Sequence, residues 1–243
     1  MTATVPPSLA QSYRHAHWYF ALALIAIVAG FWPSFFLPLG AGDVAHSLHG
    51  ITATLWVVAL IVQSALISRG LVTWHRRVAR AALVVLAVLI PSALQMVAVM
   101  FRNPEMPPFL PPVLAFIDLP SVVFFVVLVA LALRNTRTPA AHKRFMAATV
   151  LLGFPPALTR LYARLFAPTV DFMMALHLSF VTVEVILAAL IVSDWRNGER
   201  RLAYPLSLAF FVAIHALMGP VAATSAWDTA MQWYATLPIF RAS

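Results

Sequence analysis

Long apolar stretches alternate with short polar or basic connections along the 243-residue chain. A helix needs about 20 mostly apolar residues to cross the hydrocarbon core of a bilayer. Seven stretches approach or reach that length: 18–37, 44–67, 81–100, 113–133, 145–166, 172–193 and 204–224. The pattern therefore predicts an all-α fold, a polytopic membrane helix bundle with seven transmembrane helices.

The two ends of the chain are more polar than the stretches between them. Residues 1–13 contain Pro6 and Pro7 and are expected to form a flexible cytoplasmic tail. Residues 225–243 place aromatic side chains between charges, which is typical of a short helix at a membrane interface. The whole chain, 1–243, is thus predicted to be a single transmembrane domain.

Composition and charge support a membrane protein and indicate its orientation. The chain is 62% hydrophobic and only 10% charged, whereas a soluble domain has about a quarter charged residues. Its 16 Lys and Arg residues lie in short clusters between apolar stretches, which sets topology and argues against nucleic acid as a partner. With the N-terminus inside, all basic residues except Arg102, Arg160, Arg164 and Arg241 fall on the inner side. The positive-inside rule then predicts a cytoplasmic N-terminus and a periplasmic C-terminus in a bacterial inner membrane.

Several polar side chains interrupt the apolar stretches. Ionisable groups in a membrane are costly and usually face the bundle interior or a water-filled cavity. A rise of about 1.5 Å per residue places seven of them in the outer half of the bundle. They are His46, His49, Gln95, Asp118, Arg160, His177 and His215, with Glu184 one heptad below His177. Their similar depth suggests a shared site.

Four histidines are the candidate metal ligands of that site. The chain has no cysteine, so a metal must bind His, Asp, Glu or Met, and a haem must be held without thioether links. Neutral imidazole binds haem iron, zinc and non-haem iron well. The predicted ligands are His46, His49, His177 and His215, and the predicted cofactor is haem b or a divalent metal such as Zn or Fe. Haem would need two of them, while zinc or iron would need three and an open position.

The remaining polar residues complete the hypothesis. Asp118, as a general base or a further ligand, is predicted to be catalytic together with Glu184 and Arg160. Trp56, which follows His49 at a step of seven, and Gln95, which can hold a ring nitrogen of a ligand, are predicted to contact the cofactor. Such a site would serve a membrane oxidoreductase or a metal-dependent hydrolase.

Other readings of the same residues remain open. His177 and His215 can simply hydrogen-bond between helices, and Asp118 can pair with Arg160. The chain could then be a transporter or lipid-binding protein with a polar intramembrane path, or a non-catalytic accessory subunit. A broken helix at Pro155-Pro156 would suit a transporter. The expected partners are membrane lipids and a hydrophobic small molecule such as a quinone or lipid.

Basic clusters between the stretches contain two more histidines. His75 precedes Arg76-Arg77, and His142 precedes Lys143-Arg144. Their position in cytoplasmic loops predicts contacts with lipid headgroups. The neighbouring cations are expected to act as topology and headgroup anchors.

Two segments resemble an uncharacterised family of bacterial integral membrane proteins. The resemblance rests on motifs between Ala45 and Arg164, about half of the chain. They are His49-Gly50, Trp56, Gln63, His75-Arg76, Asp118, His142-Lys143-Arg144, Met146, Thr149, Pro156-Ala157 and Arg160. The family implies a polytopic membrane protein and supplies no activity. A looser similarity, histidines on several helices, extends to membrane b-type cytochromes and to seven-helix metal hydrolases.

Overall fold

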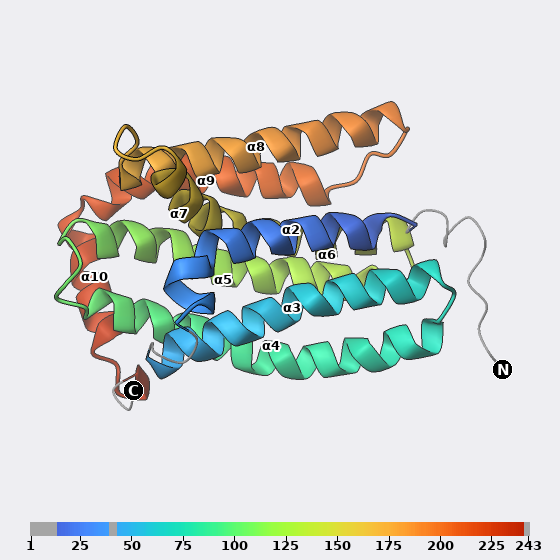
Figure 1. The fold of residues 1–243 in the computed structure, drawn as a ribbon, viewed down its shortest axis with the longest axis horizontal. Coiled ribbons are helices and arrows are strands. Elements are labelled where there is room, and N and C mark those ends of the chain that lie inside the picture. The colour runs from blue at the N-terminus through green and yellow to red at the C-terminus, as the bar shows by residue number, and fades with distance from the viewer. Residues whose placement is uncertain (1–13, 39–42, 241–243) are drawn as a thin grey trace.

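The computed structural model describes residues 14–38 and 43–240, and this part of the chain is helical and contains no strand. The expected flexible tail at 1–13 lies outside the described residues. The helices, drawn in Figure 1, are α2 (Ala16–Phe31), α3 (Val44–Ser68), α4 (Val72–Phe101), α5 (Leu110–Arg134), α6 (Pro139–Leu151), α7 (Phe154–Leu165), α8 (Phe172–Arg196), α9 (Ala203–Ala222) and α10 (Ser225–Ala235). A π-helical turn, Trp32–Phe36, extends α2.

Within residues 14–38 and 43–240, six helices are long and apolar enough to cross a membrane, as expected of a multi-pass membrane protein. They are α2 with its π-helical turn, α3, α4, α5, α8 and α9. The stretch predicted as the fifth of seven spans instead forms two short helices, α6 and α7. Pro155 and Pro156 stand in the first turn of α7, where a missing amide hydrogen costs nothing, so they mark the start of a new helix at this point.

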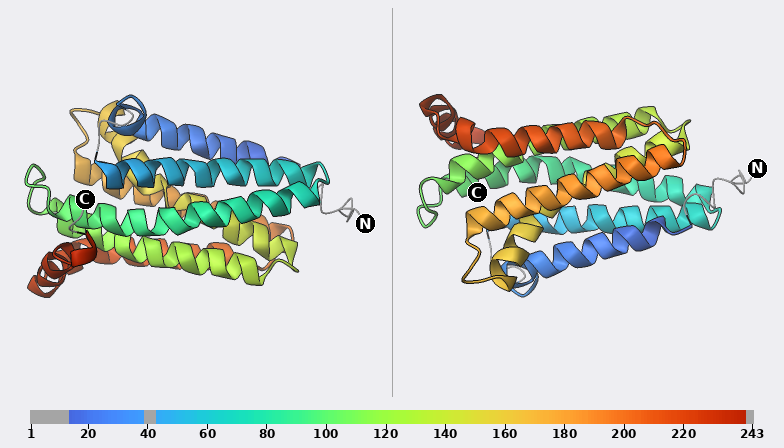
Figure 2. Two further views of the ribbon diagram at one scale, coloured as in Figure 1. Left: turned by 90° about the horizontal axis from the view of Figure 1, so that it is seen from below. Right: turned by 90° about the horizontal axis from the view of Figure 1, so that it is seen from above.

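The helices form a closed ring around α6. Neighbours around the ring are α2, α3, α4, α5, α9, α8 and α7, and α7 packs on α2 to complete it. Where α2 meets α7, Gly30 lies so close to the backbone of Ala157 that a Cβ would clash. Inside the ring α6 packs on α5 and α9 (Figure 2). The opposite side of α6, toward α2, α3 and α4, is where space is left.

Two helices begin earlier than the apolar pattern predicts. α4 starts at Val72 instead of residue 81, directly after a turn in which Gly70 adopts a φ of 75°. α6 starts at Pro139, whose missing amide hydrogen costs nothing at the first position of a helix. His75 and His142 are therefore helical residues, and their assignment to loops is wrong.

The C-terminal region confirms the short helix expected there. Thr224 caps α10 through its side chain, which accepts a hydrogen bond from the amide of Trp227. The indole of Trp227 donates to the carbonyl of Pro112 at 2.9 Å, and the hydroxyl of Tyr234 donates to that of Leu94 at 2.7 Å. These bonds fix α10 against the ends of α4 and α5.

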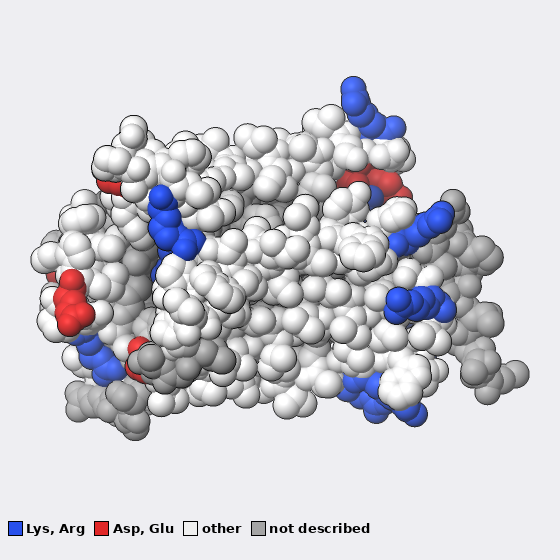
Figure 3. All heavy atoms as spheres, viewed as in Figure 1, with Lys and Arg blue, Asp and Glu red and all other residues white. Residues whose placement is uncertain are grey.

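Charged side chains collect at the two ends of the bundle and leave the middle apolar (Figure 3). We call the end with the α3–α4, α5–α6 and α8–α9 connections the basic end. Its cations include Arg69, Arg76, Arg77, Arg80, Arg134, Arg137, Lys143, Arg144, Arg196, Arg200 and Arg201. The first residues of α2 lie at this end, and α10 lies at the opposite end (Figure 1).

Candidate functional site: a cavity with two histidines

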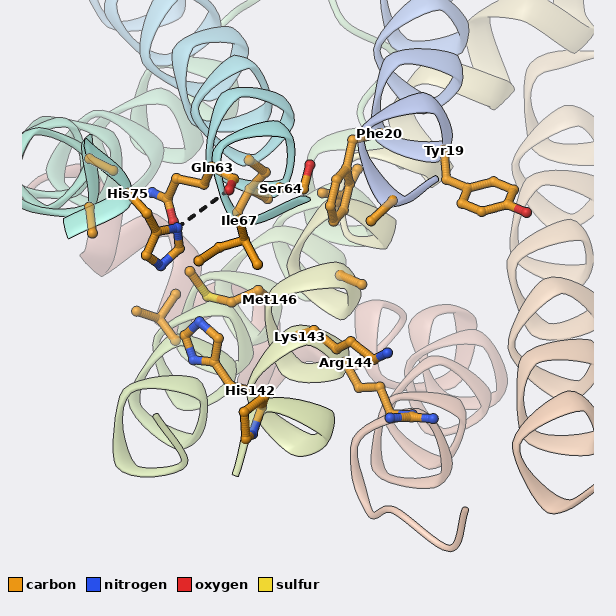
Figure 4. Close-up of a pocket in the computed structure, with 18 of the residues that line it drawn as sticks. Tyr19, Phe20, Gln63, Ser64, Ile67, His75, His142, Lys143, Arg144 and Met146 are labelled. Atoms are coloured by element: carbon orange, nitrogen blue, oxygen red, sulfur yellow. Dashed lines mark hydrogen bonds between the residues drawn. The ribbon is translucent and has the colours of Figure 1, made fainter. Parts of the chain in front are cut away.

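A cavity of about 1300 Å³ occupies the interior of the ring in the half nearer the basic end. Side chains from α2, α3, α4, α5, α6, α8 and α9 line it. Figure 4 shows His75 of α4 and His142 of α6 in one part of it, with Ile67 and Met146 close by. Two helices on opposite walls thus present imidazoles to one space.

Backbone carbonyls hold one nitrogen of each imidazole. Nδ1 of His75 lies 3.4 Å from the carbonyl oxygen of Gln63, and Nδ1 of His142 lies 2.8 Å from that of Ala132. A carbonyl can only accept, so each Nδ1 carries the proton and donates it. In a neutral imidazole the other nitrogen, Nε2, is then unprotonated. This is the arrangement found in metal-ligating histidines, whose second ring nitrogen donates to a carbonyl or carboxylate.

The end of α5 explains why the carbonyl of Ala132 can bind a side chain. Ala132 lies in the last turn of α5, where its carbonyl accepts from the amide of the C-cap residue Asn135 at 3.1 Å and can accept a second donor. His142 lies in the first turn of α6, directly after the short α5–α6 connection, and so can reach back to it. The early start of α4, at Val72, likewise places His75 beside Gln63 of α3, which runs antiparallel to α4.

Apolar and basic surfaces divide the cavity wall. Phe20, Trp56, Leu60 and Met146 contribute apolar surface. The indole of Trp56 is oriented by a hydrogen bond to the hydroxyl of Thr149 at 3.1 Å. Cationic side chains also line the cavity, and they are Arg76, Arg80, Arg137, Lys143 and Arg144. A ligand that fits both surfaces is amphipathic and carries negative charge.

Acidic groups near the cavity are already paired. Asp194 accepts two hydrogen bonds from Arg144, from Nε and from Nη2, each at 2.7 Å. Glu199, in the α8–α9 connection, accepts one from Arg201, and this interaction holds the pKa of the Glu199 carboxyl below its ordinary value. The cavity therefore keeps an excess of positive charge.

Arg144 is a buried ion-pair partner, contrary to its predicted role at the headgroups. Only 9% of its side chain and 15% of that of Asp194 are exposed. Nη1 of Arg144 also donates to the carbonyl of Ala140 at 2.7 Å. A guanidinium held by these three bonds and buried inside the bundle does not face the lipid headgroups.

In the half of the bundle away from the basic end, the structure brings His177, His215 and Glu184 together. Nδ1 of His177 lies 3.0 Å from Nε2 of His215, and Nδ1 of His215 lies 2.9 Å from Oε1 of Glu184. These residues join α8 to α9. His177 is exposed on the outside of the ring, so this group does not face the cavity.

The two α3 histidines do not join this group. Nδ1 of His46 lies 2.5 Å from a carboxylate oxygen of Asp43, the residue that caps α3. His49 is partly buried, and its Nδ1 has no hydrogen-bond partner among the described residues. In the described part of the chain, no three His, Asp or Glu side chains are grouped so that they could hold a metal ion.

The other predicted site residues are also separated. Arg160 donates from Nη1 to the carbonyl of Pro156 at 2.9 Å and lies over the ring of Phe31. It attracts the carboxyl of Asp118 through space. Gln95, half-buried on α4, is not among the residues that line the cavity, whereas Trp56 is.

Sequence reasoning missed His75 and His142 as possible ligands. A signal was present for His142, because Thr138-Pro139 is a typical helix start and puts His142 in the first turn. No comparable signal marks His75, whose position depends on α4 starting directly after Gly70. Comparisons with protein-family models, curated proteins and solved structures find no match, so the functional argument rests on this geometry.

Proposed function

We propose that the protein is a b-type haem protein of the bacterial inner membrane, in which His75 and His142 would hold the haem iron. The observation that supports this most strongly is the pair of fixed imidazoles. Each Nδ1 is bound to a carbonyl, and each side chain lines the same cavity with an unprotonated Nε2. This keeps the haem of the sequence hypothesis but moves it to the basic end and to two other histidines.

The composition of the cavity fits haem better than a bare metal ion. An isolated zinc or iron centre needs at least three protein ligands, whereas haem iron needs only axial ligands from the protein. Ligand pockets for drug-sized molecules have about 300–1000 Å³, and a cavity of about 1300 Å³ admits a larger macrocycle. The apolar wall suits its rings, and Arg76, Arg80 and Arg137 suit its two carboxylates.

The residues of the chain then have distinct roles. The carbonyls of Gln63 and Ala132 orient the imidazoles and raise their basicity as ligands. Haem, when bound, supplies one-electron transfer. Because His75 and His142 would both hold the iron, the site would favour electron transfer over oxygen chemistry.

Visible absorption of the purified full-length protein tests the proposal. We expect about one haem per chain after expression with adequate haem supply, or after reconstitution with hemin, and the low-spin spectrum typical of two histidine ligands. Haem extraction and quantification give the stoichiometry independently. A protein that is folded, by its helical circular dichroism, and takes up no haem would rule the proposal out.

A second candidate function follows from the basic and apolar lining of the cavity. An anionic lipid or a quinone, the partners expected from sequence, would place its head near Arg76 and Arg80 and its tail against the apolar wall. Tightly bound anionic lipid in native mass spectra of haem-free protein would favour this candidate. Haem uptake that displaces such a lipid would favour the first.

The proposed orientation places the basic end in the cytoplasm, with α6 and α7 together completing a seventh crossing. This follows from the Lys and Arg residues at that end and from the positive-inside rule. Reporter fusions after Arg69, Arg137 and Asn197 are expected to read as cytoplasmic, and one after Asn103 as periplasmic. A periplasmic reading at Asn197 would mean that α6 and α7 do not cross the membrane.

A further inference from the structure

Three ionisable side chains outside the cavity form one hydrogen-bonded chain along the seam between α8 and α9. Glu184 contacts Nδ1 of His215 at 2.9 Å, and Nε2 of His215 contacts Nδ1 of His177 at 3.0 Å. At about 1.5 Å per residue, His177 lies roughly 8 Å and Glu184 roughly 18 Å from the start of α8 at Phe172. The three side chains therefore cover about 10 Å along α8 and end at His177, the member nearest the start of the helix.

The order of donors and acceptors depends on the protonation state of Glu184. An ionised carboxylate only accepts, so a neutral His215 donates from Nδ1 and accepts at Nε2. His177 must then donate from Nδ1, which leaves its Nε2 as an unprotonated acceptor. One added proton makes the same Nε2 a donor. The proton can bind Nε2 of His177 directly, or it can bind Glu184 while the protons of His215 and His177 move to their Nε2 atoms.

Apolar side chains surround this polar end. His177 is exposed on the outside of the ring, and Val181, one turn further along α8, is exposed on the same face. Val212, which lies on the His215 face of α9, is also exposed. A polar nitrogen turned toward hydrocarbon without a partner is costly. The surroundings thus call for a partner with a small polar head and an apolar body.

We propose that this seam binds the head of a membrane-soluble quinone or quinol, with Nε2 of His177 as its hydrogen-bond partner. A quinol hydroxyl can donate to Nε2 of His177 when this nitrogen is unprotonated. A quinone carbonyl can accept from it when it is protonated, so each form of the ligand matches one state of Nε2. A phospholipid headgroup stays at the interface, whereas a quinone ring can enter the hydrocarbon layer to the depth of His177. Glu184 and His215 are positioning residues that determine whether Nε2 of His177 carries a hydrogen.

Hydroxyl recognition provides the test. The full-length protein in nanodiscs is titrated calorimetrically with a decyl-substituted benzohydroquinone and with its dimethyl ether, which has the same body but cannot donate. We expect the hydroquinone to bind roughly fivefold more tightly, the value of one net hydrogen bond. Quinol binding should also shift the ¹⁵N resonance of the His177 Nε2 in histidine-labelled protein.

Variants connect this discrimination to His177. His177→Phe should bind both compounds alike, His177→Gln should keep part of the difference, and Val192→Leu, an exposed control position two turns beyond Glu184 on α8, should keep all of it. Equal binding of the two compounds by the unaltered protein would overturn the proposal, as would full discrimination by His177→Phe. Efficient cross-linking of two copies through Val181→Cys, with no effect of the hydroquinone, would show that a second helix covers this face instead. None of these readouts uses haem, so the result is independent of the function proposed for the cavity.

Discussion

Alanine at His75 or at His142 is expected to abolish the low-spin haem spectrum, with a loss of haem affinity of more than about 100-fold. The reason is that each change removes a residue that would hold the iron, and even the groups that merely orient a ligand are worth about 10- to 100-fold in affinity. Haem content per folded chain, from extraction and from the absorption spectrum, measures the effect. Imidazole added to the medium should restore part of the spectrum, because it can fill the vacated ligand position.

His49→Ala is the matched control for this experiment. His49 is a partly buried histidine of the neighbouring helix α3, but it is not among the residues that line the cavity. Its replacement is expected to leave haem content unchanged. If His75→Ala and His142→Ala keep the haem spectrum and His49→Ala loses it, the haem binds at the histidines predicted from sequence instead.

Apolar length alone located most of the helices. The second stretch, predicted at 44–67, is observed as Val44–Ser68, and the fourth and sixth agree with α5 and α8 within a few residues. This works because a segment in the bilayer must form its backbone hydrogen bonds within itself, so a long apolar stretch forms a helix over its whole length. The fifth stretch failed because Pro155 divides a region whose average composition is still apolar.

The candidate site was much harder to predict. Depth could be counted from sequence, and it correctly indicated that His177 and His215 lie at similar levels. The direction in which each side chain points around its helix could not be predicted, because it depends on how the helices pack in the ring. His46 and His49 lie away from that pair. His75 and His142 were assigned to loops because charge marked them as membrane-flanking, although charged residues can continue a helix beyond the bilayer.

Arg144→Ala is expected to destabilise the protein by about 3–5 kcal/mol, the usual cost of removing one partner of a buried ion pair. Arg144 and Asp194 join α6 to α8 through two hydrogen bonds of 2.7 Å, and both side chains are largely buried. Without the guanidinium, the carboxylate of Asp194 stays in a poorly hydrated position with no counter-charge. Reversible unfolding in mixed detergent micelles measures the change in free energy.

An exposed pair at the same end of the bundle gives the comparison. Arg201 and Glu199 are 38% and 34% exposed, and surface ion pairs contribute about 0–1 kcal/mol, so Arg201→Ala should have a small effect. The double variant Arg144→Met with Asp194→Leu should recover much of the stability lost in Arg144→Ala, because apolar residues of similar volume often replace buried ion pairs without loss. If Arg144→Ala cost no more than Arg201→Ala, the contact between α6 and α8 would not depend on this pair, and Arg144 would return to its predicted role at the lipid headgroups.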